Sequence, residues 1–308
     1  MLLLSRLIAA TTVAGALLAQ EAPTFSTDTR LVVLHASVID KNGNLLTKLP
    51  KDVFKVYENN VEQQIRQFLR EDVSVSMGLV IDNSGSMRDK RQKVEAAALA
   101  LVKSSNRNDE VFVVNFNDDA FLDVPFTNDV KKMEEGLTRI DARGGTAMRD
   151  ALSMSLDEVR DKGKRYKKVL LVVTDGNDNT SVMTLEKLLE KAHRAEVLIY
   201  AIGLLNEEER REAAKAKRAL TSLANASGGI AFFPKELAEV EKIALDVANE
   251  IRNQFMISYS PTNSANDGTF RQIKVMVNTA GKPTVRTRTG YYATPPPKPG
   301  AKLSQSLR

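Results

Sequence analysis

Between residues 73 and 253, short apolar runs alternate with longer stretches in which apolar and polar side chains are mixed. The apolar runs are typical of buried β-strands, and the mixed stretches have the length and spacing of amphipathic helices. The predicted strands cover 75–81, 111–116, 121–126 (a short edge strand), 169–173, 197–202 and 230–233, and the predicted helices cover 90–103, 129–140, 147–161, 184–195, 207–226 and 237–253. This alternation predicts an α/β fold, a doubly wound and mostly parallel sheet with helices on both faces.

The two segments that flank this region, 28–72 and 254–293, have the pattern of β-strands and turns. Strands are predicted at residues 31–38, 54–57, 61–68, 255–260, 272–277 and 284–292. Neither segment has enough strands to be stable alone. We therefore predict that both segments form one antiparallel β-sandwich, with the α/β domain of residues 73–253 inserted between them. Two separate small sheets packed on that domain are the alternative.

The first 20 residues have the pattern of a secretory signal peptide. Arg6 precedes an apolar stretch that is too short for a comfortable membrane span, and small residues near Ala19 offer a cleavage site. Retention of this stretch as an anchor is the alternative, and cleavage would leave no stable transmembrane span. In both cases the folded part is expected to be secreted or to face the periplasm or cell envelope. The proline-rich tail, 294–308, is predicted to be disordered or extended.

The composition argues against several classes of function. The 308 residues include no cysteine, which excludes disulfides, thiol catalysis and thiolate metal sites. His35 and His193 are too few for a typical zinc site. The net charge of +5 is modest, and no dense block of Lys and Arg with interleaved aromatic residues occurs. Nucleic acid is therefore not an expected partner.

Polar side chains that suit a hard metal ion follow two of the predicted strands. Asp82, Ser84 and Ser86 come directly after one strand, Asp175 follows another, and Thr146 stands before a predicted helix. Ligands of such folds bind beyond the carboxyl ends of the strands, so we expect Asp82 and Asp175 to lie close together. Hydroxyl and carboxylate oxygens suit Mg²⁺, Mn²⁺ or Ca²⁺. A plain turn is the alternative for each short cluster, because Asp, Asn and Ser hydrogen-bond to their own backbone.

The order of these residues resembles a known family. Asp-Asn-Ser-Gly-Ser at 82–86, followed by Thr146 and then Asp175, is similar to the metal-ion-dependent adhesion site (MIDAS) of von Willebrand factor type A domains. The resemblance covers a little over half of the chain, about residues 73–253. It implies the fold of that family and a site that binds partner proteins through a cation.

The resemblance also implies roles for the individual side chains. Ser84 and Ser86 are expected to be direct ligands and Thr146 a conditional one, while Asp82 and Asp175 orient ligands and supply charge. The expected ion is Mg²⁺, or else Mn²⁺ or Ca²⁺. With few direct carboxylate ligands, such an ion keeps exchangeable water. The expected partner is a protein ligand whose Asp or Glu carboxylate replaces that water.

Residues beside the predicted ligands are expected to have other roles. Asp178 is expected to cap a turn rather than touch bound water, and Asp150 to interact with a helix N-terminus rather than with metal. Gly144 and Gly145 are expected to let the threonine loop approach the ion, with a simple turn as the alternative. Residues 117–119 either shape partner choice or are an ordinary polar loop.

The sequence thus predicts a binding or adhesion module and not an enzyme. A serine hydrolase is the less favoured alternative, because no Gly-x-Ser-x-Gly motif occurs and only two histidines are available as bases. Phosphotransfer through Asp82 lacks the expected Asp-x-Asp arrangement. A subunit or scaffold of an envelope assembly differs from an adhesion module only in its partner, and the two readings stay open.

Overall fold

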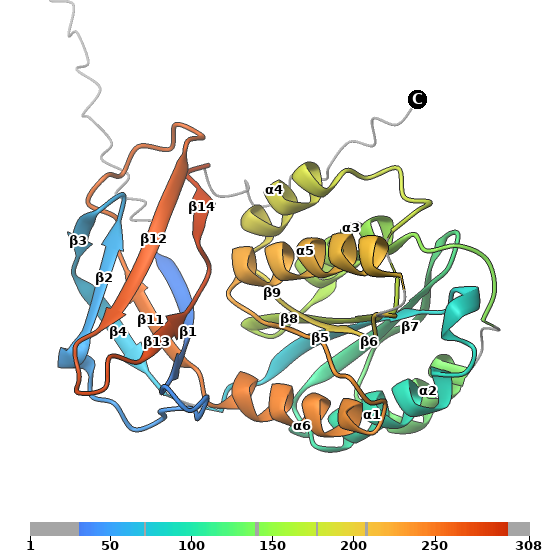
Figure 1. The fold of residues 1–308 in the computed structure, drawn as a ribbon. Coiled ribbons are helices and arrows are strands. Elements are labelled where there is room, and N and C mark those ends of the chain that lie inside the picture. The colour runs from blue at the N-terminus through green and yellow to red at the C-terminus, as the bar shows by residue number, and fades with distance from the viewer. Residues whose placement is uncertain (1–30, 71, 139–141, 177, 207–208, 295–308) are drawn as a thin grey trace, which may run out of the picture.

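The computed structural model describes residues 31–70, 72–138, 142–176, 178–206 and 209–294. The predicted signal peptide and almost all of the predicted tail lie outside these residues. Within the described ranges, no helix is both long enough and apolar enough to cross a membrane. The chain forms a β-sandwich and an α/β domain that lie side by side (Figure 1).

In the described part of the chain, six strands form the central sheet of the α/β domain in the order β10-β9-β8-β5-β6-β7. These strands are β5 (Val75–Asp82), β6 (Glu110–Phe116), β7 (Ala120–Thr127), β8 (Lys167–Thr174), β9 (Leu198–Gly203) and β10 (Ala231–Phe232). Neighbouring strands run parallel except β6 and β7, which are antiparallel. The doubly wound, mostly parallel α/β fold is confirmed, and the predicted edge strand is β7.

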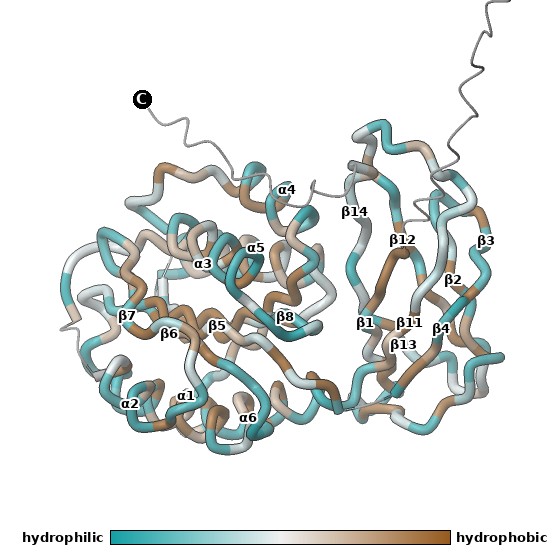
Figure 2. Tube along the Cα trace, turned by 180° about the vertical axis from the view of Figure 1, so that it is seen from behind, coloured by the Kyte–Doolittle hydropathy of each residue, from teal (hydrophilic) through white to brown (hydrophobic). Residues whose placement is uncertain are grey.

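Helices cover both faces of this sheet (Figure 1). They are α1 (Arg91–Lys103), α2 (Val130–Thr138), α3 (Met148–Lys162), α4 (Leu185–Ala195), α5 (Arg210–Ser227) and α6 (Glu239–Arg252). Side chains of α1, α2 and α6 pack on the face that contains Leu79, and those of α3, α4 and α5 pack on the face that contains Val80. Alternate residues of β5 thus enter separate cores, as the two-residue period of a strand requires. Figure 2 shows the hydrophobic strands between these helices.

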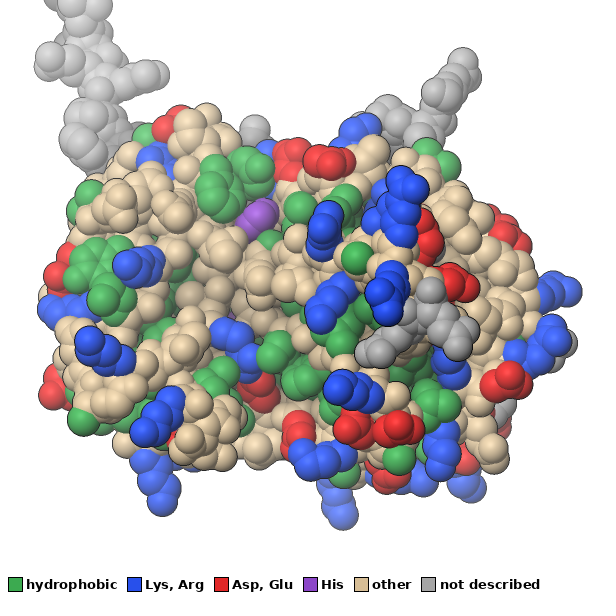
Figure 3. Space-filling model, viewed as in Figure 1, with side chains coloured by type: hydrophobic (Ala, Val, Ile, Leu, Met, Phe, Trp, Pro, Cys, Tyr) green, Lys and Arg blue, Asp and Glu red, His purple; other side chains and the backbone are tan. Residues whose placement is uncertain are grey.

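The exposed sides of α4 and α5 carry ion pairs at helical spacing. Arg194 pairs with Glu190 at 2.8 Å, and Lys215 pairs with Glu212 at 2.8 Å. Figure 3 shows charged side chains of both signs near one another on this face. Exposed pairs of this kind contribute only about 0.3–0.5 kcal/mol each. Apolar packing against the sheet, rather than charge, therefore holds the two helices in place.

Two antiparallel sheets of four strands form the sandwich, in the orders β13-β1-β11-β4 and β14-β12-β2-β3. Their strands are β1 (Val32–Ile39), β2 (Phe54–Glu58), β3 (Val61–Gln63), β4 (Ile65–Leu69), β11 (Phe255–Tyr259), β12 (Phe270–Val277), β13 (Thr284–Arg286) and β14 (Gly290–Tyr292). Both sheets mix the two ends of the chain, because β1 pairs with β11 and β2 pairs with β12. The single sandwich is therefore confirmed, and the alternative of separate N- and C-terminal sheets is wrong.

Two stretches that the sequence predicts as single strands are each divided between the sheets. Residues 61–68 contribute to β3 in one sheet and β4 in the other, and residues 284–292 contribute to β13 and β14. The single-strand prediction is wrong at both places. Alternation of polar and apolar residues shows which side chains face a core, but it does not show that the chain changes sheets at a corner.

A buried polar network joins the sandwich to the α/β domain where α6 runs into β11. Glu250 on α6 is 6% exposed, and its Oε1 accepts hydrogen bonds from Ser37 Oγ on β1 at 2.8 Å and from Tyr200 OH on β9 at 3.2 Å. Its Oε2 accepts one from Arg286 Nη2 on β13 at 2.5 Å. Gln254 Nε2 donates to Ser37 Oγ and Tyr200 OH. One carboxylate thus connects three strands from two parts of the fold.

The same junction contains a buried lysine whose ionisation gives stability a testable pH dependence. Lys167 is 2% exposed and donates to the carbonyl of Ile251; burial lowers its pKa to about 8, although nearby carboxylates oppose the shift. Between this pKa and the unfolded value of about 10.4, the unfolded chain binds more protons, so this contribution to stability rises with pH. As the pH rises across that window, we expect the free energy of unfolding of wild type to increase by up to about 3 kcal/mol relative to that of Lys167→Met.

Urea unfolding of both proteins at pH values inside and below this window measures the effect. The difference between the proteins cancels the titration of other groups, including the buried tyrosines. A difference in unfolding free energy that does not change with pH would contradict this account of Lys167.

Candidate metal centre

The candidate site lies at the edge of the sheet where β5 and β8 end. The two strands are parallel neighbours with Ile81 opposite Val173, so the next residues, Asp82 and Thr174, lie side by side. Thr174 Oγ1 donates a hydrogen bond of 2.5 Å to Asp82 Oδ2. Asp175 follows directly, so two carboxylates far apart in sequence reach one edge, as parallel topology predicts.

One of the two predicted serine ligands bonds to Asp175, and the other lies next to the first. Ser86 Oγ donates to Asp175 Oδ1 at 2.8 Å, and the hydroxyl oxygens of Ser84 and Ser86 are 3.2 Å apart. A short 3-10 helix, Gly85–Met87, turns the chain after Ser84 and places Ser86 next to it. Asp82 Oδ1 accepts a hydrogen bond of 2.8 Å from the backbone N–H of Ser84 and so fixes the start of this loop.

The loop that contains Thr146 joins this group through backbone contacts. The N–H of Gly85 donates to the carbonyl of Gly144 at 3.2 Å, which ties the serine loop to the threonine loop. Thr146 itself is 4% exposed, and its N–H donates to Asn179 Oδ1 at 2.8 Å. A Cβ built on Gly176 would lie 3.7 Å from Thr146 Oγ1, so this hydroxyl is next to the segment that follows Asp175. The structure therefore brings the five predicted ligand residues to one place.

Gly144 has a conformational reason to be glycine. Its φ is +76°, and a Cβ there would lie 2.1 Å from Asp118 Oδ2. Asp118 Oδ1 accepts a hydrogen bond of 2.7 Å from the N–H of Gly145. The Asp118 carboxylate therefore holds the threonine loop, and Gly144 leaves it the space to do so.

Two further acidic residues near the site, Asp178 and Asp150, hold the backbone of neighbouring segments. Asp178 accepts hydrogen bonds from Arg149 N–H at 2.6 Å and Ser181 Oγ at 2.7 Å, and it pairs with the Arg149 guanidinium at 2.8 Å. Asp150 accepts from the N–H groups of Val182 and Met183, both at 2.9 Å. Both carboxylates thus connect the start of α3 to the loop before α4.

Part of this region matches a protein family. Residues 77–177 match the model of the von Willebrand factor type A domain. The chain contains a von Willebrand factor type A domain. The matched range begins in β5 and ends just after Asp175, so it includes all five predicted ligand residues.

Individual proteins also resemble this type A domain. An uncharacterized protein of Borreliella burgdorferi is 28% identical over 141 residues, which are 45% of this chain and 40% of that protein. Integrin alpha-11 of Homo sapiens is 33% identical over 108 residues, which are 33% of this chain and 9% of the integrin. The chain therefore spans less than half the length of these two curated relatives.

A solved structure shares the fold. Proximal thread matrix protein 1 from the mussel byssus, determined with a zinc-occupied MIDAS motif, has a TM-score of 0.51 and 19% identity. The similarity covers 63% of this chain and 49% of that chain. At this level of identity the likeness shows the fold alone.

In this type A domain a lysine contacts one of the predicted ligand residues. Lys90 lies just before α1, and its Nζ donates to Asp175 Oδ2 at 2.5 Å. The side chains of Lys90 and Asp175 are 24% and 1% exposed. Asp175 is therefore bonded on both oxygens, to the ammonium through one and to Ser86 through the other. The ammonium supplies positive charge that a buried carboxylate requires.

The second carboxylate of the site, Asp82, is also buried. Asp82 is 1% exposed, and burial raises its pKa to about 6. Hydrogen bonds from Thr174 and Ser84 favour the charged form and oppose this shift, while the charge of Asp175 adds to it. The site therefore contains two carboxylates, one of which pairs with the Lys90 ammonium, and a further cation would offset the remaining negative charge.

The donor atoms fit a hard divalent cation. The five predicted residues offer hydroxyl and carboxylate oxygens, which Mg²⁺, Mn²⁺ and Ca²⁺ accept. In the residues that the structure describes, no group of three or more His, Cys, Asp or Glu side chains is placed to hold a metal. A cation at this edge would therefore depend on the serine and threonine hydroxyls. One positive charge, the Lys90 ammonium, already contacts Asp175 at this site.

Sequence reasoning missed Lys90, Thr174 and Asn179. Thr174 and Asn179 are ordinary polar residues of a strand end and a loop, and their roles depend on tertiary contacts. Lys90, in contrast, has a local feature in the sequence that points to a distant partner. It stands at the N-terminus of α1, next to Arg91, and the first turn of this helix contains no acidic residue. Positive charge is unfavourable at a helix N-terminus, so a partner elsewhere was to be expected.

Proposed function

We propose that this protein is a binding module that takes up a protein ligand through a divalent cation. Asp82, Ser84, Ser86, Thr146 and Asp175 would hold the cation, which we propose to be Mg²⁺, with Mn²⁺ or Ca²⁺ as substitutes. The observation that carries the proposal is a chain of oxygen atoms, in which the Ser86 hydroxyl bonds to the buried Asp175 carboxylate and lies 3.2 Å from the Ser84 hydroxyl, with an ammonium already bound to the same carboxylate. When bound, such a cation keeps a coordination position for a partner's carboxylate.

The residues of the chain have distinct parts in this proposal. Ser84 and Ser86 would supply neutral oxygen ligands. The cation would therefore keep its positive charge and attract an acidic partner. Asp82 fixes the backbone of Ser84 and would contribute charge. Thr146 lies on a loop that hydrogen bonds from Asn179 and Asp118 hold in place. Loops held in this way place ligands without movement when a cation arrives.

The comparisons support this reading. The domain is similar in sequence to integrin alpha-11. It shares its fold with the mussel matrix protein, which was determined with a zinc-occupied MIDAS motif. We extend the MIDAS motif of the mussel protein to this chain as part of the proposal. We also propose that the protein is secreted or faces the cell envelope, with a role as subunit or scaffold of an envelope assembly as the alternative.

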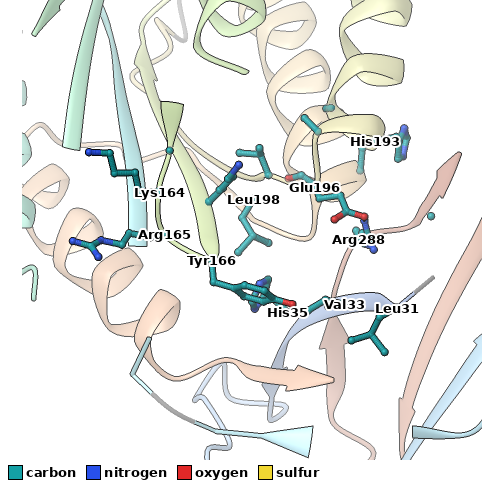
Figure 4. A pocket seen from close by; sticks show the side chains of 18 residues that line it. Leu31, Val33, His35, Lys164, Arg165, Tyr166, His193, Glu196, Leu198 and Arg288 are labelled. Carbon is teal, nitrogen blue, oxygen red and sulfur yellow. The ribbon is translucent and has the colours of Figure 1, made fainter. Parts of the chain in front are cut away.

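The positions of the histidines favour binding over hydrolysis. His35 and His193 both line a cavity of about 490 Å³ (Figure 4). Lys164, Arg165 and Leu198 line the same cavity, so it lies at the amino ends of β8 and β9. The serines lie at the opposite ends of the strands. Neither histidine is therefore placed to activate Ser84 or Ser86 as a nucleophile.

Selection from a library of random peptides tests the proposed function. The protein is immobilised, the library is bound in the presence of Mg²⁺, and bound peptides are eluted with EDTA. We expect the eluted peptides to share an Asp or Glu and to lose binding to the Ser84→Ala/Ser86→Ala variant. Peptides that lack an acidic residue, or that bind equally in EDTA, would contradict a cation-dependent carboxylate site.

A further inference from the structure

Two neighbouring basic residues at the start of α1 have different surroundings. Arg91 pairs with Glu95 on its own helix at 2.6 Å and donates to the carbonyl of Leu137. Lys90 instead reaches away from the helix to Asp175, at 2.5 Å. The helix does not explain this position, because its N-terminal dipole disfavours a cation there. The contact with the candidate site is the interaction that accounts for it.

The ammonium and a divalent cation would compete for the same carboxylate. Asp175 presents Oδ1 to Ser86 and Oδ2 to Lys90. A cation held by Ser86 and Asp175 would repel the ammonium, and like charges at contact distance in a partly buried site are strongly unfavourable. Lys90 would have to leave Asp175, but its flexible side chain keeps the ammonium tethered at this edge of the sheet.

We propose that Lys90 exchanges partners. It pairs with Asp175 in the absence of a cation, and it pairs with the ligand's carboxylate once a cation has displaced it. This inference rests on the proposed function and adds a second contact for the same ligand, so the ligand's acidic group meets both a cation and an ammonium. Cation and ligand then bind cooperatively, because each is favoured by the state in which Lys90 has left Asp175.

Calorimetric titration with Mn²⁺ tests the first half of this exchange. Lys90→Met removes the competitor, and we expect it to bind Mn²⁺ about tenfold tighter than wild type, the change that follows from loss of one charge-assisted hydrogen bond. Lys90→Arg keeps a competing cation and should bind Mn²⁺ like wild type. Lys93→Met, an exposed lysine on the same helix, is the matched control and should show no change.

Acetate serves as the probe for the second half of the exchange, the contact between Lys90 and the ligand's carboxylate. Chloride at the same ionic strength is the control. We expect acetate to raise the Mn²⁺ affinity of wild type and of Lys93→Met, and to raise that of Lys90→Met less. If Lys90 only competed with the cation, its removal would leave the effect of acetate on Mn²⁺ affinity unchanged. A smaller acetate effect in Lys90→Met therefore indicates that Lys90 contacts the carboxylate. Circular dichroism of each variant checks that it is folded.

The outcomes separate this inference from the function on which it rests. Absence of Mn²⁺ binding in wild type and in folded Lys90→Met would overturn the cation site itself. Equal Mn²⁺ affinity in wild type, Lys90→Met and Lys93→Met would overturn the exchange while leaving the cation site in place. Tighter Mn²⁺ binding in Lys90→Met with an undiminished acetate effect would overturn the contact between Lys90 and the ligand.

Discussion

Replacement of Glu250 by alanine is expected to lower the free energy of unfolding by about 3–5 kcal/mol. The Glu250 carboxylate accepts hydrogen bonds from Ser37, Tyr200 and Arg286, which belong to β1, β9 and β13. Alanine would leave the Arg286 guanidinium, which is 20% exposed, without its carboxylate. Removal of one partner from a largely buried ion pair costs far more than removal of an exposed pair, because the remaining charge is poorly solvated.

Urea unfolding followed by circular dichroism measures this loss. Glu241→Ala is the matched control, because Glu241 lies on the same helix but is exposed, and its removal should change stability by less than about 0.5 kcal/mol. Equal stability of the two variants would show that the network does not join the sandwich to the α/β domain energetically. Separate unfolding of the two parts in Glu250→Ala would instead locate the loss at their junction.

The second large effect concerns the candidate site. In the Ser84→Ala/Ser86→Ala variant, Mg²⁺ should no longer stabilise the protein against unfolding. In wild type, a cation at about 100 times its dissociation constant should add about 2.7 kcal/mol to the free energy of unfolding, because it binds the folded state. The variant loses the hydroxyl oxygen that bonds to Asp175 and the second hydroxyl oxygen 3.2 Å from the first. The two carboxylates that remain, one of them paired with Lys90, are a poor set of ligands for Mg²⁺.

Thermal unfolding with and without MgCl₂ measures this effect for both proteins. Ser104→Ala/Ser105→Ala is a suitable control, because it removes two hydroxyls that donate to the Leu101 carbonyl at the end of α1. The control should respond to Mg²⁺ like wild type. A Mg²⁺ response that persists in the Ser84→Ala/Ser86→Ala variant would place the cation elsewhere on the protein.

Much of the fold and the candidate site could be predicted from local patterns. Apolar runs such as 75–81 and 169–173 indicated buried parallel strands, and parallel topology alone placed Asp82 and Asp175 at one edge. Thr146 depended on the resemblance to type A domains, since a threonine before a helix has no local feature that points to a metal. Helix bounds were predicted within about three residues, as expected when end signals are weak.

What the sequence did not predict depends on contacts between distant segments. Glu250 has the spacing of a polar residue on an amphipathic helix, yet it is buried against three strands. The division of 61–68 and 284–292 between two sheets follows from how the sheets close, not from their alternation. Lys90 contacts Asp175, 85 residues away in the chain, because β5, the strand that precedes α1, is the parallel neighbour of β8.

Isothermal titration of the EDTA-treated protein with Mg²⁺ and Mn²⁺, alongside the Ser84→Ala/Ser86→Ala variant, tests the central claim most directly. The account predicts saturable binding at one site in wild type and its loss in the variant, which remains folded. Equal heats of binding in the two proteins would contradict a cation site built on these serines. Absence of binding in wild type, even with acetate present to complete the coordination, would contradict the metal-dependent module and leave a metal-free type A scaffold.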